Sequence, residues 1–283
     1  MQTIKIGGVP EHFNLPWHMC REEGKFKAEQ INLEWQEYPD GTGALARDLR
    51  EEKLDAAIIL TEGVVKEIIA GTDLKIVQKY ISTPLIWGIH VAASSSFQSL
   101  DDLKQGTAAI SRFGSGSHLM AYVNAKNAGW DVKSLKFEQI INLEGAVEAL
   151  TQGKADYFLW EHFTTKPLVD KGIFRRIGDC PTPWPAFVIA VRTDFLDQHQ
   201  DWVEKMLQVI NAATRGFKNI PAINQVLARN YDQHQKDIDQ WLGITNWSQD
   251  QISVTELAQV QEQLLELELI PHTIPNADFL HYF

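Results

Sequence analysis

The chain has 283 residues, a formal net charge of −11 at pH 7 and a hydrophobic fraction of 44%. This length and composition are typical of a globular protein with one large domain or two smaller ones. The acidic balance argues against nucleic acid as a partner, because non-specific binding to it requires a basic surface. No apolar run is long enough to span a bilayer, so no membrane insertion is predicted. A small anionic ligand stays open, since a cleft can be electropositive within an acidic protein.

The N-terminus and the two cysteines bear on cellular location. Residues 1–6 lead directly into a strand pattern, without the basic, apolar and small-residue regions of a signal peptide. We therefore expect a cytoplasmic protein if Met1 is the native start, and a periplasmic or lipid-anchored one if a signal peptide has been removed. Cys20 and Cys180 lie far apart and form neither a disulfide framework nor a zinc motif. We expect two free thiols in the core.

Short apolar runs alternate with helical segments in the first third of the chain. The pattern predicts strands over 4–9, 31–37, 55–60, 74–80 and 85–92. A helix is expected from Asn14, as its cap, to Gly24. Two further helices are expected, one after the glycines of 41–43 and one over 63–70.

A second set of elements begins near Ser99, where Ser-Leu-Asp-Asp has the pattern of a helix start. Further strands are predicted over 107–111, 135–141, 155–160 and 187–192. Helices are predicted over 114–128, 144–151, 162–171, 202–217, 222–232, 237–242 and 253–265. Strands that alternate with helices indicate βαβ units and a largely parallel sheet.

A faint internal repeat accompanies this alternation. Three residues return at one constant spacing: Lys53, Asp55 and Gly71 recur as Lys154, Asp156 and Gly172. Each triplet surrounds a buried strand and the helix after it, so the repeat indicates either two lobes built alike or coincidence. No Gly/Ser/Pro-rich linker divides the chain, and strand patterns run through 85–92 and 184–192. This organisation favours two lobes joined by crossing strands.

The strongest local motif is Ser-Arg-Phe-Gly-Ser-Gly-Ser-His at 111–118, between a strand and a helix. A helix N-terminus presents unpaired N–H groups and a positive dipole end, and small residues let an anion approach it. In a ligand site the loop would contribute Arg112, Ser115, Gly116, Ser117 and His118. The alternative is a simple cap, in which a serine satisfies the helix. The motif is neither a Walker loop nor a dinucleotide fingerprint.

Other polar and aromatic residues follow the ends of predicted strands. Ligands of open α/β sheets bind at that edge, and an aromatic wall with a few convergent polar groups is the usual make-up of a small-molecule site. Each residue taken singly is more often a cap, a surface loop or a core aromatic. The strand-end residues that we assign to the ligand site are Glu11, His12, Gly43, Glu62, Glu161 and Trp184.

Catalytic motifs are not found. There is no Gly-x-Ser-x-Gly elbow and no His-Glu-x-x-His. A histidine beside a carboxylate could bind a metal or move protons, so an enzyme stays an alternative. The residues that could meet in this way are His12, His118 and His162 with Glu11, Glu62 or Glu161. Without a spacing signature we assign no catalytic residue, no metal ligand and no cofactor.

Several motifs together resemble a known family. The segment 22–27, Glu-Glu-Gly-Lys-Phe-Lys, followed by Ile-Asn-Leu-Glu at 31–34, resembles the opening motif of nitrate/sulfonate/taurine and thiamine-precursor binding proteins, with Gln30 in place of the usual glycine. The resemblance covers about residues 4–192. It continues through the segments 54–58, 71–77, 99–104, 114–117 and 153–157.

The resemblance implies an α/β fold of the periplasmic binding protein type II kind. Each lobe would be a mixed, mostly parallel sheet flanked by helices, with a C-terminal helical tail. Lobe 1 would be 1–88 plus 188–283 and lobe 2 would be 89–187, with hinge strands near 85–92 and 184–192. The lobes would close on a small molecule. The positions that match the family's ligand loops are Glu11, His12, Gly43, Glu62, Ser115, Gly116, Ser117, Glu161 and Trp184.

The function that this resemblance implies is solute binding, with an ABC permease as partner if the protein is exported. A cytosolic branch of the family is also similar to this chain. Two cytosolic enzymes share the fold, a thiamine-pyrimidine synthase, whose cysteine cluster is absent here, and a chorismate dehydratase. A ligand sensor is a third possibility. The glutamates favour a cationic or hydrogen-bonding ligand, whereas the Ser/Gly loop and Arg112 favour an anion, so the ligand stays open.

Overall fold

All residues from 1 to 283 are described by the computed structural model. They form two units, each with its own sheet. Unit 1 comprises 1–83 and 184–283, and unit 2 comprises 84–183. No helix has the length and apolar character needed to cross a bilayer. Cys20 and Cys180 are free and buried, which confirms the prediction made for both thiols.

The sheet of unit 1 has the strand order β2-β1-β3-β10-β4. Its strands are β1 (Gln2–Gly8), β2 (Ile31–Glu37), β3 (Ala56–Leu60), β4 (Leu74–Ile81) and β10 (Phe187–Arg192). β1 runs parallel to β2 and β3, and β10 runs antiparallel to β3 and β4. Every residue of β3 is buried, because a central strand covered on both faces carries a continuous apolar run.

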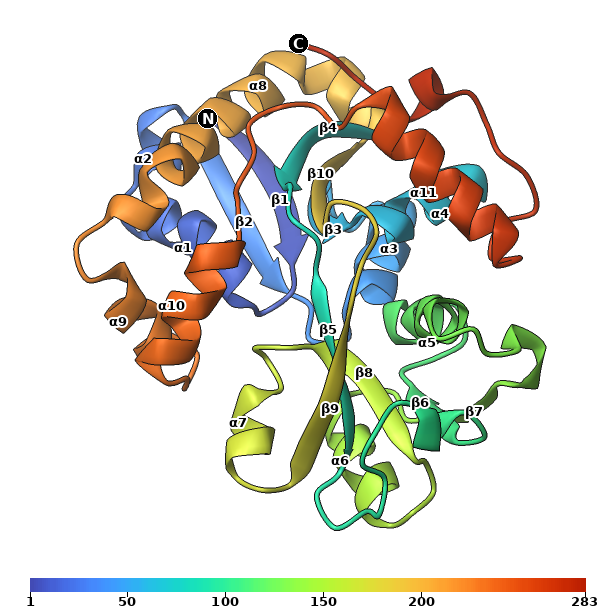
Figure 1. The fold of residues 1–283 in the computed structure, drawn as a ribbon. Coiled ribbons are helices and arrows are strands. Elements are labelled where there is room, and N and C mark those ends of the chain that lie inside the picture. Colours follow the sequence, from blue (N-terminus) through green and yellow to red (C-terminus); the bar gives the residue numbers. More distant parts are fainter. The chain divides into compact units, whose positions relative to one another are not determined.

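Helices cover both faces of this sheet. They are η1 (His12–Asn14), α1 (Leu15–Glu22), α2 (Lys25–Ala28), α3 (Thr42–Arg50), α4 (Thr61–Ile69), α8 (Thr193–Gly216), η4 (Phe217–Asn219), α9 (Ile223–Asn230), α10 (Gln235–Ile244), α11 (Val254–Glu266) and η5 (Asn276–Phe279). Figure 1 shows α1, α2 and α8 along one side of the sheet and α3, α4 and α11 along the other. The long helix α8 kinks at His199, whose backbone leaves the helical region.

The sheet of unit 2 has the order β7-β6-β8-β5-β9. Its strands are β5 (Ile86–Ala92), β6 (Thr107–Ile110), β7 (Lys136–Gln139), β8 (Tyr157–Glu161) and β9 (Phe174–Pro181), and its helices are η2 (Asp101–Leu103), α5 (Gly116–Asn127), η3 (Val132–Ser134), α6 (Leu143–Thr151) and α7 (Lys166–Asp170). Ala109, Phe158 and Phe174 of the strands form one apolar core with Ala146 and Leu150 of α6. This core fixes the helix on one face of the sheet.

The two sheets share one topology. In each, a parallel trio is followed by an antiparallel strand, β10 in unit 1 and β5 in unit 2. The aspartates of the sequence repeat make the same contact in both: Asp55 Oδ2 accepts from the backbone N–H of Lys5 at 2.8 Å, and Asp156 Oδ2 accepts from that of Thr107 at 2.7 Å. The predicted internal repeat is therefore structural, since the same carboxylate ties together the same two strands twice.

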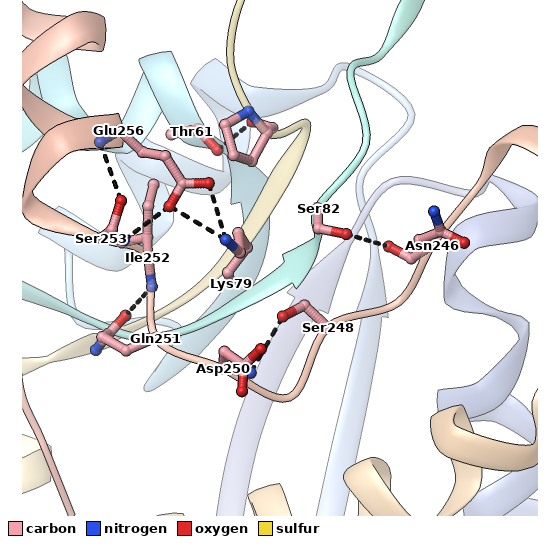
Figure 2. A network of polar contacts seen from close by, with 11 residues as sticks. Thr61, Lys79, Ser82, Asn246, Ser248, Asp250, Gln251, Ile252, Ser253 and Glu256 are labelled. Atoms are coloured by element: carbon pink, nitrogen blue, oxygen red, sulfur yellow. Dashed lines mark hydrogen bonds and ion pairs between the residues drawn. The ribbon is translucent and has the colours of Figure 1, made fainter.

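Polar contacts join residues 246–256 to β4 and to Ser82, which follows it (Figure 2). Lys79 Nζ of β4 lies 2.8 Å from Glu256 Oε1, and Glu256 also completes a capping box with Ser253 at the start of α11. Ser82 Oγ donates to the Asn246 carbonyl at 3.2 Å, and the N–H of Ser248 donates to the carbonyl of Tyr80 at 2.9 Å. These bonds hold the helical tail along the edge strand of the sheet.

Some local predictions were wrong. Strand β9 was not predicted, because this edge strand is only partly buried and its sequence, FRRIGDCP, has no alternating apolar pattern. The expected helix over 162–171 shortens to α7, which begins beside Pro167. Ser99 opens only a single turn, η2. The side chain of Asn14 does not cap α1, and its Nδ2 donates to the Val9 carbonyl instead, at 2.8 Å.

Candidate functional site

In unit 1 the carboxyl ends of β1, β2 and β3 and the start of β10 meet at one edge of the sheet. This follows from the topology, because the three strands are parallel and β10 runs the opposite way next to β3. The structure therefore brings five of the predicted ligand-site residues to one edge. They are Glu11, His12, Gly43, Glu62 and Trp184.

Glu62 is the buried carboxylate of this edge. It lies in the first turn of α4 with 2% of its surface exposed, and its Oε2 accepts a hydrogen bond of 2.8 Å from Trp184 Nε1. Burial raises the pKa of the Glu62 carboxyl to about 7, while the Trp184 bond and Lys66 act in the opposite direction. A carboxyl with that pKa exchanges its proton near neutral pH, so it can accept from or donate to a ligand.

Trp184 is held in place by its chain neighbours. Thr61 Oγ1 donates to the carbonyl of Pro185 at 2.6 Å, and the backbone N–H of Thr61 donates to the carbonyl of Ala186 at 3.1 Å. The segment that enters β10 is thereby fixed to the residue next to Glu62. The indole, 3% exposed, is consequently a fixed donor to the carboxylate.

The glycine loop between β2 and α3 packs directly on α4. A Cβ at Gly63 would lie 2.2 Å from Thr42 Cγ2. We expect Gly63→Ala to destabilise the protein by about 1–3 kcal/mol through overpacking. Adding Thr42→Ser should recover most of the loss, because serine lacks the methyl group, and urea denaturation of both single variants and the double variant measures the coupling. Losses that simply add in the double variant would contradict this contact.

His12 is packed among aromatic rings of unit 1. Its ring stacks on Trp241 at a centroid distance of 4.3 Å and an interplanar angle of 3°, and Tyr231 lies 5.5 Å away. Burial lowers the pKa of His12 to about 3, so the ring is neutral at pH 7. This environment makes His12 a poor proton acceptor. The placement suits a hydrogen bond or stacking contact better than acid–base chemistry.

In unit 2 the Ser/Gly loop joins β6 to α5, and three hydroxyls meet inside it. Ser117 Oγ lies 3.2 Å from Ser111 Oγ and 3.1 Å from Ser115 Oγ, and it accepts from the N–H of Ser111 at 2.9 Å. Ser115 caps α5 by accepting from the N–H of His118. Two oxygen–oxygen contacts use two of the three hydroxyl protons, so one proton is left to donate.

Two roles are considered for this loop, a helix cap and a contact to a ligand. The cap is present, and the first backbone N–H groups of α5, at Gly116 and Ser117, keep the unpaired state of a helix N-terminus. The remaining hydroxyl proton and these N–H groups are all donors, which suits an anion or a carbonyl oxygen. His118 turns its Nδ1 to the N–H of Gly114 at 3.0 Å, and Arg112, at the end of β6, is half-buried.

Glu161 is the last residue of the neighbouring parallel strand, β8, and His162 follows it. Glu161, 3% exposed, accepts from the N–H of Thr164 at 2.6 Å, and burial raises the pKa of its carboxyl. His162 Nδ1 lies 2.7 Å from Asp179 Oδ1 of β9. Because β6 and β8 are parallel neighbours, Glu161 and the Ser/Gly loop lie at the same edge of the sheet. The predicted residues of unit 2 that meet there are Arg112, Ser115, Gly116, Ser117, His118 and Glu161.

Two contacts of the site residues were not predicted from the sequence. Trp241 stacks on His12 from the helical tail, and Asp179 pairs with His162 from the strand that was not predicted. Neither carries a local signal, because the partners are distant in the chain. The structure gathers no group of three or more His, Cys, Asp or Glu side chains suited to a metal ion.

Comparison with solved structures decides the fold. The Ca3427 gene product of Candida albicans, described as having the generic periplasmic binding protein fold, aligns with a TM-score of 0.90 and 21% identity over 99% of this chain and 96% of that one. The chain has the type II periplasmic-binding-protein fold. The sequence model of the Ca3427-like PBP family matches residues 87–180, which lie within unit 2 of this fold. The predicted fold class is confirmed.

Other proteins with this fold bind small molecules. The alkanesulfonate-binding protein SsuA of Xanthomonas axonopodis pv. citri, bound to MOPS, aligns with a TM-score of 0.84 and 15% identity over 100% of this chain and 99% of that one. The ligand-binding component of an ABC-type import system from Staphylococcus aureus, with zinc bound, aligns with a TM-score of 0.78 and 16% identity over 100% and 97%. A comparison with curated protein sequences finds no match.

Proposed function

We propose that this protein is a non-catalytic solute-binding protein whose two units close on one small molecule. The observation that carries the proposal is that both sheets place buried polar groups at the carboxyl ends of their parallel strands. Two sheets of one topology each bring polar side chains that are almost fully buried, Glu62 in unit 1 and Ser117 and Glu161 in unit 2, to the carboxyl ends of their parallel strands. Burial of polar groups is costly unless each finds a partner, so such groups at the edge where α/β proteins bind ligands favour a binding role.

The two edges differ in what they supply. Unit 1 offers an acceptor, the Glu62 carboxylate, whereas the Ser/Gly loop of unit 2 offers donors. A ligand that touches both would prefer a closed state, and a ligand can shift a conformational equilibrium only through such differential contacts. The strands β5 and β10, which follow the two chain passages from one unit to the other, are the hinge in this proposal.

Partnership with a transporter belongs to the same proposal. The fold is shared with a binding component of an ABC-type import system and with an alkanesulfonate-binding protein, which supports delivery of the bound solute to an ABC permease if the chain is exported. In a form that stays in the cytoplasm the same binding event would sequester or sense the solute.

The proposal is tested by a thermal-shift panel of sulfonates, pyrimidines and amino acids, followed by small-angle scattering with each compound that binds. We expect saturable binding, a smaller radius of gyration in the bound state, and recovery of the compound unchanged by mass spectrometry. Ser117→Ala should weaken binding about 2- to 10-fold, the usual effect of one hydrogen bond.

The matched control is Ser134→Ala, since the Ser134 hydroxyl of unit 2 donates only to the carbonyl of Asp131 in an exposed turn. This variant should bind like the wild type. A bound compound that leaves the radius of gyration unchanged would contradict closure. Conversion of the compound into a product would instead show an enzyme.

A further inference from the structure

Glu62 has an unused acceptor. Its Oε1 is buried and has no hydrogen-bond partner, although Oε2 is bonded to Trp184 Nε1 at 2.8 Å. Unpaired polar atoms are rare in protein interiors, since each one loses its bonds to water without replacement. This oxygen lies in the side chain that unit 1 presents at the carboxyl end of β3. We therefore expect Oε1 of Glu62 to bind a group that does not belong to the protein chain.

Burial raises the pKa of Glu62 to about 7, but several nearby groups act against burial and favour the ionised form. Trp184 Nε1 donates to Oε2 of the carboxyl at 2.8 Å, and the nearby backbone N–H of Glu62 also lowers the pKa of the carboxyl. The carboxyl also lies in the first turn of α4, where the helix dipole favours negative charge. Burial opposes ionisation, and Lys66, one turn further along α4, lowers the pKa of the carboxyl through its positive charge. Ionised, Oε1 can only accept, so the missing partner is a donor.

A cationic donor satisfies this site better than a neutral one. Oε1 of Glu62 has no hydrogen-bond partner, so no cationic group of the protein bonds to that oxygen, although the charge of Lys66 lowers the pKa of the carboxyl. Buried charges are tolerated when they are paired, and a hydrogen bond between ionised groups is roughly twice as strong as a neutral one. A protonated nitrogen supplies both the proton and the counter-charge.

We propose that Glu62 Oε1 binds a protonated nitrogen of the ligand, so that the solute is a small organic ammonium compound. The inference rests on the proposed function and specifies one end of its ligand. A hydroxyl in place of the ammonium would supply the hydrogen bond without the charge. A ligand pair that differs only in this group therefore isolates the contribution of Glu62.

The experiment uses three such pairs, titrated calorimetrically into the full chain at pH 8. They are taurine with isethionate, β-alanine with 3-hydroxypropionate, and 2-aminoethylphosphonate with 2-hydroxyethylphosphonate. We expect the amine of at least one pair to bind at least about tenfold tighter than its hydroxyl partner. Glu62→Gln should lower the affinity for that amine about 10- to 100-fold, the usual range for a bond to a charged group, and should change the affinity for the hydroxyl compound little.

The pH dependence supplies a second readout. An alkylamine stays protonated from pH 8 to pH 6, whereas Glu62 takes up its proton near pH 7, so binding of the amine should weaken as the pH falls. In Glu62→Gln this dependence should disappear. The control is Glu256→Gln, which removes another first-turn glutamate of unit 1, one that is already paired with Lys79, and should keep the amine preference.

Failure of this inference is separable from failure of the proposed function. Equal binding of amine and hydroxyl partners, or an amine preference that survives Glu62→Gln, overturns the ammonium assignment. Such binding with compaction in small-angle scattering would still leave the solute-binding function standing. Binding by none of the three amines also overturns the assignment, because each one offers the group that it requires.

Discussion

Glu62→Gln should stabilise the protein at pH 8, and the gain should fade towards pH 5. Burial raises the pKa of the folded-state carboxyl from 4.5 to about 7. The folded chain therefore binds more protons than the unfolded chain between these values, and stability falls as the pH rises through that window. Above pH 7 the ionised group lowers stability by about 3 kcal/mol, an upper limit that the uncharged amide would remove. Urea denaturation at both pH values measures the difference.

Glu256 provides a control of opposite sign. Its bonds to Lys79 and Ser253 lower the pKa of this carboxyl despite some burial. A lowered folded-state pKa gives stability that is present above the unfolded value and is lost as the pH falls through the folded value. Glu256→Gln should accordingly destabilise the protein at pH 8. A pH-independent effect of Glu62→Gln would show that shape, and not charge, decides the stability at that position.

Gly145→Ala should destabilise the protein, although alanine is the better helix former. Gly145 lies in the first turn of α6, and a Cβ there would lie 2.0 Å from the carbonyl oxygen of Ile140. That oxygen is backbone and accepts from the N–H of Asn142 at 2.9 Å, so it cannot move without disturbing the Asn142 cap of the helix. Overpacking of this kind costs about 1–3 kcal/mol, and loss of the cap adds about 1 kcal/mol.

The control for this prediction is Gly243→Ala in α10. A Cβ at Gly243 meets nothing within 4 Å. Without a clash the change should follow helix propensity and stabilise the protein by about 0.5–1 kcal/mol. Urea denaturation of both variants should thus give shifts of opposite sign. A neutral or stabilising Gly145→Ala would mean that the first turn of α6 can move away from Ile140.

The βα alternation and the repeat are visible in the sequence because they depend on local patterns. The run Ala-Ala-Ile-Ile-Leu at 56–60 predicts a strand buried on both faces, and it is the central strand β3. Asp55 and Asp156 mark the same strand start twice, and the structure shows that each bonds to the backbone of the neighbouring parallel strand. The strand-end residues were found in the same way, since ligand loops of parallel sheets follow the carboxyl ends of the strands.

Contacts between distant parts of the chain needed the tertiary structure. Strand β9 lies at the edge of its sheet and is only partly buried, so its sequence has no alternating apolar pattern. It is recognised as a strand by its pairing with β5, which the sequence does not show. The same holds for the stacking of Trp241 on His12. These interactions depend on which segments the fold brings together, and hydrophobic periodicity records only which side of a segment is buried.

The sequence by itself determined the order of the elements, the two repeated halves and the edge at which each half carries its polar residues. The tertiary structure decided the chemical state of those residues. Glutamate is usually exposed, and the sequence does not show that Glu62 is buried. Its burial beside Trp184 raises the pKa of its carboxyl and leaves Oε1 without a hydrogen-bond partner. Burial and partners, which set the free energy of a charge, are properties of the packed chain and not of its local pattern.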